Sequence, residues 1–206
     1  MDSISVLPDT TLAQHGKVTQ AFLNRGIRSF QAACRWTRDL PYGFNSRRES
    51  MVVFEEGRGT CTTKHGIIAR LAEEQSLAVH KHLVFYRLDD SIVTGVGDII
   101  GPAGLAFIPQ AHCILKYGPH CVDLTAGNCN GKNKSIDTWD FIIKTDADLS
   151  SEQEREHYLE VLERYFPIEP RLKSIGSEGV LTLLEHCNHH LKSTCSLLGR
   201  GRIERC

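Results

Sequence analysis

The thiol of Cys61 stands in a sequence context that suits a nucleophile. It follows residues 57–60, Gly-Arg-Gly-Thr, and precedes an apolar pattern of helical spacing. This order predicts that Cys61 begins a helix, where unpaired amide N–H groups and the positive end of the helix dipole favour an anion. A thiol in that position ionises more readily, and the thiolate is the nucleophilic form. The sequence therefore predicts cysteine-nucleophile chemistry at Cys61.

His112 and Asp123 are the candidate base and the candidate group that orients it. They lie in two β-like segments, residues 111–117 and 121–125, on either side of Gly118-Pro119. Two such segments around a short Gly-containing turn predict a β-hairpin. The hairpin would bring the imidazole and the carboxylate together from different parts of the chain.

The length of the hairpin loop decides whether the two side chains can meet. With a two-residue loop, Tyr117 faces His120 and Ile114 faces Asp123. His112 and Asp123 then share one face as diagonal neighbours, with Cα atoms about 7–8 Å apart or less. A four-residue loop keeps this parity, whereas a plain three-residue loop reverses it. The pair therefore requires an even loop or a bulge.

These three residue types together make an acyl-transfer mechanism possible. Cys61 would attack a carbonyl, His112 would take the thiol proton and later give it to the leaving group, and Asp123 would fix the tautomer of His112. The backbone N–H of Cys61 is the expected donor to the oxyanion. A second oxyanion donor is left open, with Trp36, Asn45 and Thr60 as candidates.

Three segments in this order resemble the transglutaminase-like superfamily, the circularly permuted relatives of papain-type cysteine proteases. The matching segments are Gly59-Thr60-Cys61 with the helix after it, Ala111-His112-Cys113, and Val122-Asp123-Leu124-Thr125. The separations, 51 residues from Cys61 to His112 and 11 from His112 to Asp123, also suit the superfamily. The lead-in through Trp36 and Tyr42 looks similar too. The resemblance covers about residues 16–128.

The resemblance implies an α+β fold in which the nucleophile helix packs on an antiparallel sheet, with extra C-terminal helices outside the matched region. It also implies an acyl-enzyme mechanism on an amide or ester. Members of the superfamily include peptidases, amidases, crosslinking transglutaminases and non-catalytic proteins. We expect a cysteine-dependent hydrolase or acyltransferase acting on the amide bond of a peptide or similar substrate. Crosslinking is less favoured because nothing in the chain suggests a calcium site. Arylamine acetyltransferase activity is less favoured because residues 61–64 lack the acidic residue usual in those enzymes.

Three alternatives accompany this interpretation. His65 lies four residues after Cys61 on the same helix face and could itself act as the base, or it could join Lys64 in adding local positive charge. A binding or scaffold module that keeps the fold without turnover is the second alternative. Zinc binding is the third, because His and Cys side chains recur at residues 112–113, 120–121, 129 and 187–190. No Cys-x-x-Cys pair is present, and adjacent strand residues point to opposite faces, so we expect no metal and no cofactor.

Length and composition favour one domain over residues 1–206. The chain has 206 residues, of which 41% are hydrophobic, and a formal net charge of −1. A net charge this close to zero gives no overall positive field that would attract nucleic acid, so we expect no nucleic-acid partner. The oligomeric state is left open. We expect a core over about residues 16–128, a helical extension over about 150–192, and a solvated basic tail over 193–206 that contains Arg200, Arg202 and Arg205.

The N-terminal residues and the cysteines bear on cellular location. Residues 1–9 lack the basic and apolar regions of a secretory signal, and no apolar run approaches the ~20 residues that span a bilayer. We therefore expect no membrane partner. The chain has eight cysteines, and in a long sequence without a signal we expect reduced thiols. The expected location is the cytoplasm.

Residue patterns predict the element order helix, helix, strands, helices, typical of an α+β domain. We expect helices over 16–37, 61–75, from Ser151 to Pro167, and 177–192; strands over 78–87, 111–117 and 121–125; a loop over 46–56; and a strand or extended loop over 91–97.

Overall fold

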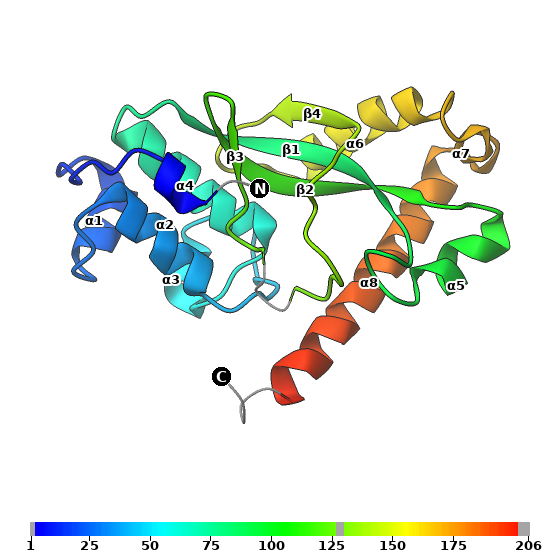
Figure 1. The fold of residues 1–206 in the computed structure, drawn as a ribbon, viewed down its shortest axis with the longest axis horizontal. Coiled ribbons are helices and arrows are strands. Elements are labelled where there is room, and N and C mark those ends of the chain that lie inside the picture. Colours follow the sequence, from blue (N-terminus) through cyan, green and yellow to red (C-terminus); the bar gives the residue numbers. More distant parts are fainter. Residues whose placement is uncertain (1–2, 127–129, 202–206) are drawn as a thin grey trace. The chain divides into compact units, whose positions relative to one another are not determined.

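The structure is a computed structural model that describes residues 3–126 and 130–201, with side chains up to residue 191. Figure 1 labels its main helices and strands in chain order. The helices are η1 (Ile4–Val6), α1 (Gly16–Leu23), α2 (Phe30–Asp39), α3 (Val52–Glu56), α4 (Cys61–Glu74), α5 (Val96–Ile100), η2 (Gly101–Ala103), α6 (Ser151–Tyr165), α7 (Pro170–Ile175) and α8 (Ser177–Gly201). The strands are β1 (Val79–Leu88), β2 (Ile108–Tyr117), β3 (His120–Val122) and β4 (Phe141–Lys144).

The described strands form one antiparallel sheet in the order β3-β2-β1-β4, so the predicted α+β class is confirmed. β2 pairs with β3 in a register that sets Leu115 opposite Val122 and Tyr117 opposite His120. The loop between them is therefore Gly118-Pro119 alone. This is the even, two-residue loop that the candidate His–Asp pair requires.

The chain divides into two compact units, each built from three stretches of sequence. The first contains residues 1–84, 112–128 and 142–150, and the second contains residues 85–111, 129–141 and 151–206. All the candidate catalytic residues belong to the first unit.

The core of the first unit packs the apolar face of α4 with residues of α1, α2 and the strands. Ile67, Ile68, Leu71 and Ala72 of α4 are fully buried, as the helical pattern predicts. The same cluster includes these residues from other elements: Phe22, Phe30, Val79, Leu115, Val122 and Leu124. Because α4 is packed along most of its length, the position of its first residue, Cys61, is fixed.

The second unit has its own buried side chains on α6. Tyr158, Val161, Leu162 and Tyr165 are buried, the face that the sequence pattern predicts. The Tyr158 hydroxyl donates to the carbonyl oxygen of Pro109 at 2.9 Å. That bond ties α6 to the first part of β2 within this unit.

The predicted single helix over residues 16–37 is wrong, because the chain forms two helices, α1 and α2. Gly26 between them has a φ of +77°, in the left-handed region that glycine adopts at low cost. Ser29 then caps α2 by accepting a hydrogen bond from the N–H of Ala32 at 3.3 Å. The apolar spacing is roughly helical on both sides of Gly26, so the sequence pattern did not indicate this turn.

Other elements also differ from the expectation. The predicted loop over 46–56 contains α3, and residues 91–97 form a turn that leads into α5 rather than a strand. The short elements β4 and α7 have no counterpart in the prediction. The last helix extends past residue 192 to Gly201, while Arg202 and Arg205 of the predicted tail lie outside the described residues.

Two findings bear on the environment of the chain. Within residues 3–126 and 130–201, the helices are too short or too polar to cross a bilayer. Among the cysteines whose side chains are described, Cys34, Cys61, Cys113, Cys121 and Cys187 are thiols and not half-cystines.

Candidate active site

The start of α4 is fixed by hydrogen bonds around Thr60, the residue before the helix. The N–H of Thr60 donates to the Thr63 hydroxyl at 3.0 Å, and that hydroxyl donates to Oδ1 of Asn45 at 2.8 Å. Gly59 is required here because a Cβ atom at this position would lie 2.8 Å from the Thr63 oxygen. Cys61 is thus presented at a helix start that is tied to the preceding loop. The amide of Thr60 is used in this tie, which removes it as a candidate oxyanion donor.

His112 and Asp123 form the buried pair that the hairpin parity predicts. Nε2 of His112 lies 2.9 Å from Oδ2 of Asp123, and each side chain is only 2% exposed. Oδ1 of Asp123 accepts hydrogen bonds from the N–H and the hydroxyl of Thr125, both at 2.7 Å. The carboxylate is therefore held at both oxygens and cannot rotate away from the ring.

The electrostatics of this pair favour the ionised carboxylate. Burial by itself would raise the pKa of Asp123, but the charge and the hydrogen bond of His112 outweigh burial. The hydrogen bond from Thr125 acts in the same direction. The pKa of Asp123 consequently lies well below its usual range, so the group is a carboxylate at neutral pH.

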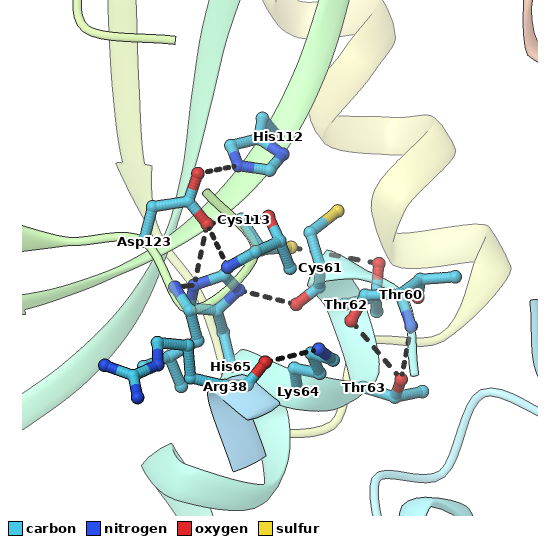
Figure 2. Close-up of polar contacts among 12 residues, drawn as sticks. Arg38, Thr60, Cys61, Thr62, Thr63, Lys64, His65, His112, Cys113 and Asp123 are labelled. Atoms are coloured by element: carbon cyan, nitrogen blue, oxygen red, sulfur yellow. Dashed lines mark hydrogen bonds and ion pairs between the residues drawn. The ribbon is translucent and has the colours of Figure 1, made fainter. Parts of the chain in front are cut away.

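Cys61 approaches this pair from α4. In Figure 2 the His112 ring lies between the Asp123 carboxylate and the Cys61 side chain, with Nε2 toward Asp123 and Nδ1 on the side of Cys61. Cys61 is half-buried, whereas His112 and Asp123 are buried. Cys61 is thus the most exposed residue of the trio.

His65 has a different role from that of a base. Its Nδ1 lies 2.7 Å from the carbonyl oxygen of Cys61, and the N–H of Leu124 donates to its Nε2 at 2.8 Å. Nε2 is therefore an acceptor, and the proton sits on Nδ1. Burial lowers the pKa of His65 to about 4, which keeps the ring neutral at pH 7. His65 ties the helix start to the segment that carries Asp123, and this geometry does not support its use as the base.

Lys64 is directed to the end of α2. Its Nζ donates to the carbonyl oxygen of Arg38 at 3.0 Å and also to that of Leu40. Burial lowers its pKa to about 8. The ammonium group thus serves the C-terminal carbonyls of α2, where a cation is favoured.

The sequence reasoning missed Cys113 as a neighbour of Cys61. The Cys113 thiol is buried and donates to Oγ1 of Thr62, the residue after Cys61, at 3.8 Å, and Cys61 is the main cause of its raised pKa. Lys81 of β1 is also buried nearby and donates to the carbonyl oxygen of Ala147 at 2.5 Å. Because adjacent strand residues point to opposite faces, the spacing of His112 and Cys113 gave no reason to expect Cys113 beside the first turn of α4.

Asn45 and Trp36, two candidates for the second oxyanion donor, make other contacts in the structure. The amide nitrogen of Asn45 donates to Oε2 of Glu56 at 3.1 Å and to the carbonyl oxygen of Arg58 at 3.0 Å. Trp36 stacks on Phe54 with 5.4 Å between ring centroids. The Asn45 amide is therefore not set to donate at the thiol, whereas Trp36 stays a candidate. The N–H of Thr63 is bonded to the Thr60 side chain, so the N–H groups of Cys61 and Thr62 are the donors that the first turn of α4 offers.

The second unit contains a separate cavity of about 360 Å³. The candidate catalytic residues do not line it. Its walls include Tyr86, Arg87, Lys134, Trp139 and Asp140. Arg87 and Asp140 form a bidentate ion pair with both distances at 3.0 Å, so two of the lining charges neutralise each other.

The residues considered for zinc can be compared with the part of the chain that the structure describes. No group of three or more His, Cys, Asp and Glu side chains there is placed to hold an ion. Cys129, one of the residues considered for zinc, lies outside the described residues. The neighbouring positions His112 and Cys113 are engaged with Asp123 and Thr62.

The candidate site thus consists of a half-buried cysteine at a helix start, a buried imidazole–carboxylate pair on a hairpin, and a second, buried cysteine. Comparison of the chain with protein-family models, with curated proteins and with solved structures finds no match.

Proposed function

We propose that this protein is a cysteine-dependent hydrolase or acyltransferase that acts on an amide bond through Cys61, His112 and Asp123. The observation that carries the proposal is the hydrogen bond of 2.9 Å between His112 and Asp123. A buried imidazole that a carboxylate orients is the arrangement that activates a neighbouring thiol. The half-buried position of Cys61 at the first residue of α4 supports its role as the nucleophile.

The reaction would use each group in turn. His112 accepts the Cys61 proton at Nδ1, and the thiolate attacks the carbonyl carbon of the amide. The N–H of Cys61 stabilises the oxyanion. His112 then protonates the leaving amine, which yields an acyl-enzyme. Water, or an acceptor nucleophile in the case of acyl transfer, attacks the thioester with His112 as base, and the acyl product leaves.

The order of elements supports assignment to the transglutaminase-like superfamily. A cysteine at the start of a helix, a histidine on a strand and an aspartate after the paired strand follow one another as the resemblance implies. The substrate class we propose is a peptide or another amide. The five described thiols support a reducing location such as the cytoplasm, and the net charge of −1 supports a partner other than nucleic acid.

Labelling of the thiol tests this proposal. The full chain is treated with iodoacetamide near neutral pH, and the alkylated cysteine is identified by mass spectrometry. We expect Cys61 to react first and Cys61→Ala to lose this fast labelling. Cys121→Ala is the matched control, because Cys121 is a half-buried thiol on β3 in the same unit. Equal rates at another cysteine in Cys61→Ala would contradict the assignment of Cys61 as the activated thiol.

Turnover is then measured with a library of peptides and simple amides, comparing the wild type with Cys61→Ala and His112→Ala. We expect release of an amine in the wild type and its loss in both variants. Amine release that survives both substitutions would rule out this site as its source.

The cavity of the second unit favours a second candidate function, a non-catalytic binding module. An aromatic wall, Tyr86 and Trp139, stands beside charged groups there, a combination common in small-molecule sites. Quenching of Trp139 fluorescence by a compound library, with Trp139→Phe as the control, tests this candidate. Ligand binding together with a slowly reacting Cys61 would favour the module over the enzyme.

A further inference from the structure

Two cysteine side chains, Cys61 and Cys113, lie at the start of α4 in the candidate active site. The Cys113 thiol donates to Oγ1 of Thr62, the residue after Cys61, at 3.8 Å, and the Cys61 side chain is the largest single influence on the pKa of Cys113. Figure 2 shows the side chain of Cys113 beside the first turn of α4. Both residues are thiols in this structure. They come from α4 and β2, so a bond between them would join two elements that are 52 residues apart in the chain.

The two thiols differ in their exposure to solvent. Cys61 is half-buried, whereas Cys113 is only 1% exposed. A small oxidant in solution therefore reaches Cys61 before the buried Cys113. Exposure of this kind sets the order in which the two sulfurs react.

The surroundings of Cys113 keep it in the protonated thiol form while Cys61 is unmodified. The hydrogen bond with Cys61, followed by burial and the charge of Cys61, raises the pKa of Cys113 well above the ordinary value. Lys81 acts in the opposite direction and lowers it. Conversion of Cys61 to a neutral sulfenic acid would remove the opposing charge and leave Lys81 in place. Cys113 would then ionise more readily.

We propose that Cys61 and Cys113 form a reversible disulfide when the protein meets a peroxide, with Cys113 as the resolving thiol. Hydrogen peroxide first converts the Cys61 thiol to a sulfenic acid, releasing one water as its O–O bond breaks. The Cys113 sulfur then attacks the Cys61 sulfur, the S–O bond breaks, and the hydroxyl leaves with the Cys113 proton as a second water. Two thiols lose two electrons in total, and the peroxide is reduced by the same two electrons.

This inference rests on the proposed function only in needing a reactive thiol at Cys61, and it deepens that proposal by giving the site a means of regulation. The disulfide removes the nucleophile and so stops acyl transfer. It also protects Cys61 from oxidation to the sulfinic acid, a form that thiol reductants do not reverse.

The test is direct detection of the bond in the wild-type chain. The protein is treated with hydrogen peroxide, its remaining thiols are alkylated, and it is digested with trypsin without a reductant. Cleavage after Arg58, Lys64, Arg87 and Lys116 places Cys61 in residues 59–64 and Cys113 in residues 88–116. We expect one species in which these two peptides are linked, two hydrogen masses lighter than their sum, and its disappearance after dithiothreitol.

Variants test the protective role. After peroxide and then dithiothreitol, we expect maleimide labelling of Cys61 to return in the wild type and in the matched control Cys121→Ser. In Cys113→Ala, the returned labelling should be lower by about fivefold or more, because the sulfenic acid proceeds to the sulfinic acid. Equal recovery in Cys113→Ala and in the wild type would overturn the resolving role of Cys113.

Two further outcomes separate this inference from the proposed function. Failure to find the linked peptides after peroxide overturns the inference. Diamide oxidises dithiols without a sulfenic acid, so linked peptides that form with diamide alone do not rescue it. If untreated Cys61 still shows fast labelling and amide turnover, only the disulfide proposal has failed. If the linked peptides appear in a protein that turns over no amide, the disulfide proposal stands and the proposed hydrolase or acyltransferase activity fails.

Discussion

Nε2 of His112 lies 2.9 Å from Oδ2 of Asp123, while Oδ1 of the same carboxylate is held twice by Thr125. The two side chains are removed from water, so their hydrogen bond is not in competition with solvent. The carboxylate has a fixed orientation, and through it the ring has one as well. This fixed ring is the basis of the first two predictions below.

Asp123→Asn should slow the thiol chemistry with little change in shape. Because Thr125 occupies the position of Oδ1 with two donors, the asparagine oxygen will take that place and its amide nitrogen will face His112. An N–H donor there makes Nε2 an acceptor and puts the ring proton on Nδ1, the side of Cys61. We expect amide turnover to fall about 10²- to 10⁴-fold.

The measurement is the rate of amine release and of iodoacetamide labelling as a function of pH. Asp148→Asn is the matched control, since Asp148 is another ion-paired carboxylate of the first unit with a lowered pKa. It should reduce stability without altering the pH profile of labelling. A wild-type profile in Asp123→Asn would show that Asp123 does not set the tautomer.

The length of the hairpin loop should control the site. Inserting one glycine between Gly118 and Pro119 makes a three-residue loop, which moves Asp123 to the face opposite His112. Inserting two glycines restores the parity of the face. We expect fast labelling of Cys61 to be lost with one added residue and kept with two. Equal behaviour of the two insertions would show that the register does not matter for the thiol.

His65 should make the protein less stable in acid over a defined range. Burial lowers its pKa from about 6.5 in the unfolded chain to about 4 in the fold. As the pH falls through this interval, the unfolded state binds a proton that the folded state excludes. The free energy of unfolding therefore decreases between about pH 6.5 and pH 4, by on the order of 3 kcal/mol, and is unaffected by this group above pH 6.5.

Urea unfolding at a series of pH values checks this, with His65→Gln compared with the wild type. The variant should lose the decrease in this interval. His15→Gln, a change at an exposed position, controls for the general loss of a histidine. The contribution of Asp123 is separate: its lowered pKa stabilises the fold above about pH 4 and is lost at lower pH.

Thr63 should matter for both stability and reactivity. Its hydroxyl accepts from the N–H of Thr60 and donates to Asn45, so Thr63→Val leaves the approach to Cys61 without two hydrogen bonds. We expect a loss of about 1–2 kcal/mol in the free energy of unfolding. Slower labelling of Cys61 should accompany it. Thr63→Ser keeps the hydroxyl and is the matched variant; an equal loss in both would attribute the effect to packing instead.

Local pattern was enough to predict the helix that Cys61 begins and the parity of the hairpin. Both depend on neighbours along the chain: glycine and threonine before an apolar repeat, and two β-like segments around Gly118-Pro119. Local pattern failed between residues 16 and 37, where Gly26 and the Ser29 cap interrupt a continuous apolar spacing. It also missed α3, α7 and β4, whose four to six residues are too short for a periodic signal.

The sequence alone determined the candidate trio, because a thiol at a helix start and two polar residues of matched strand parity are readable from spacing. Tertiary structure decided the rest. It engaged both nitrogens of His65, directed Lys64 to the end of α2, and set the thiol of Cys113 against Thr62 in the first turn of α4. These contacts join segments that are far apart in the chain. Their partners depend on how α4 packs in the first unit, and the spacing of residues along one strand or one helix does not encode that packing.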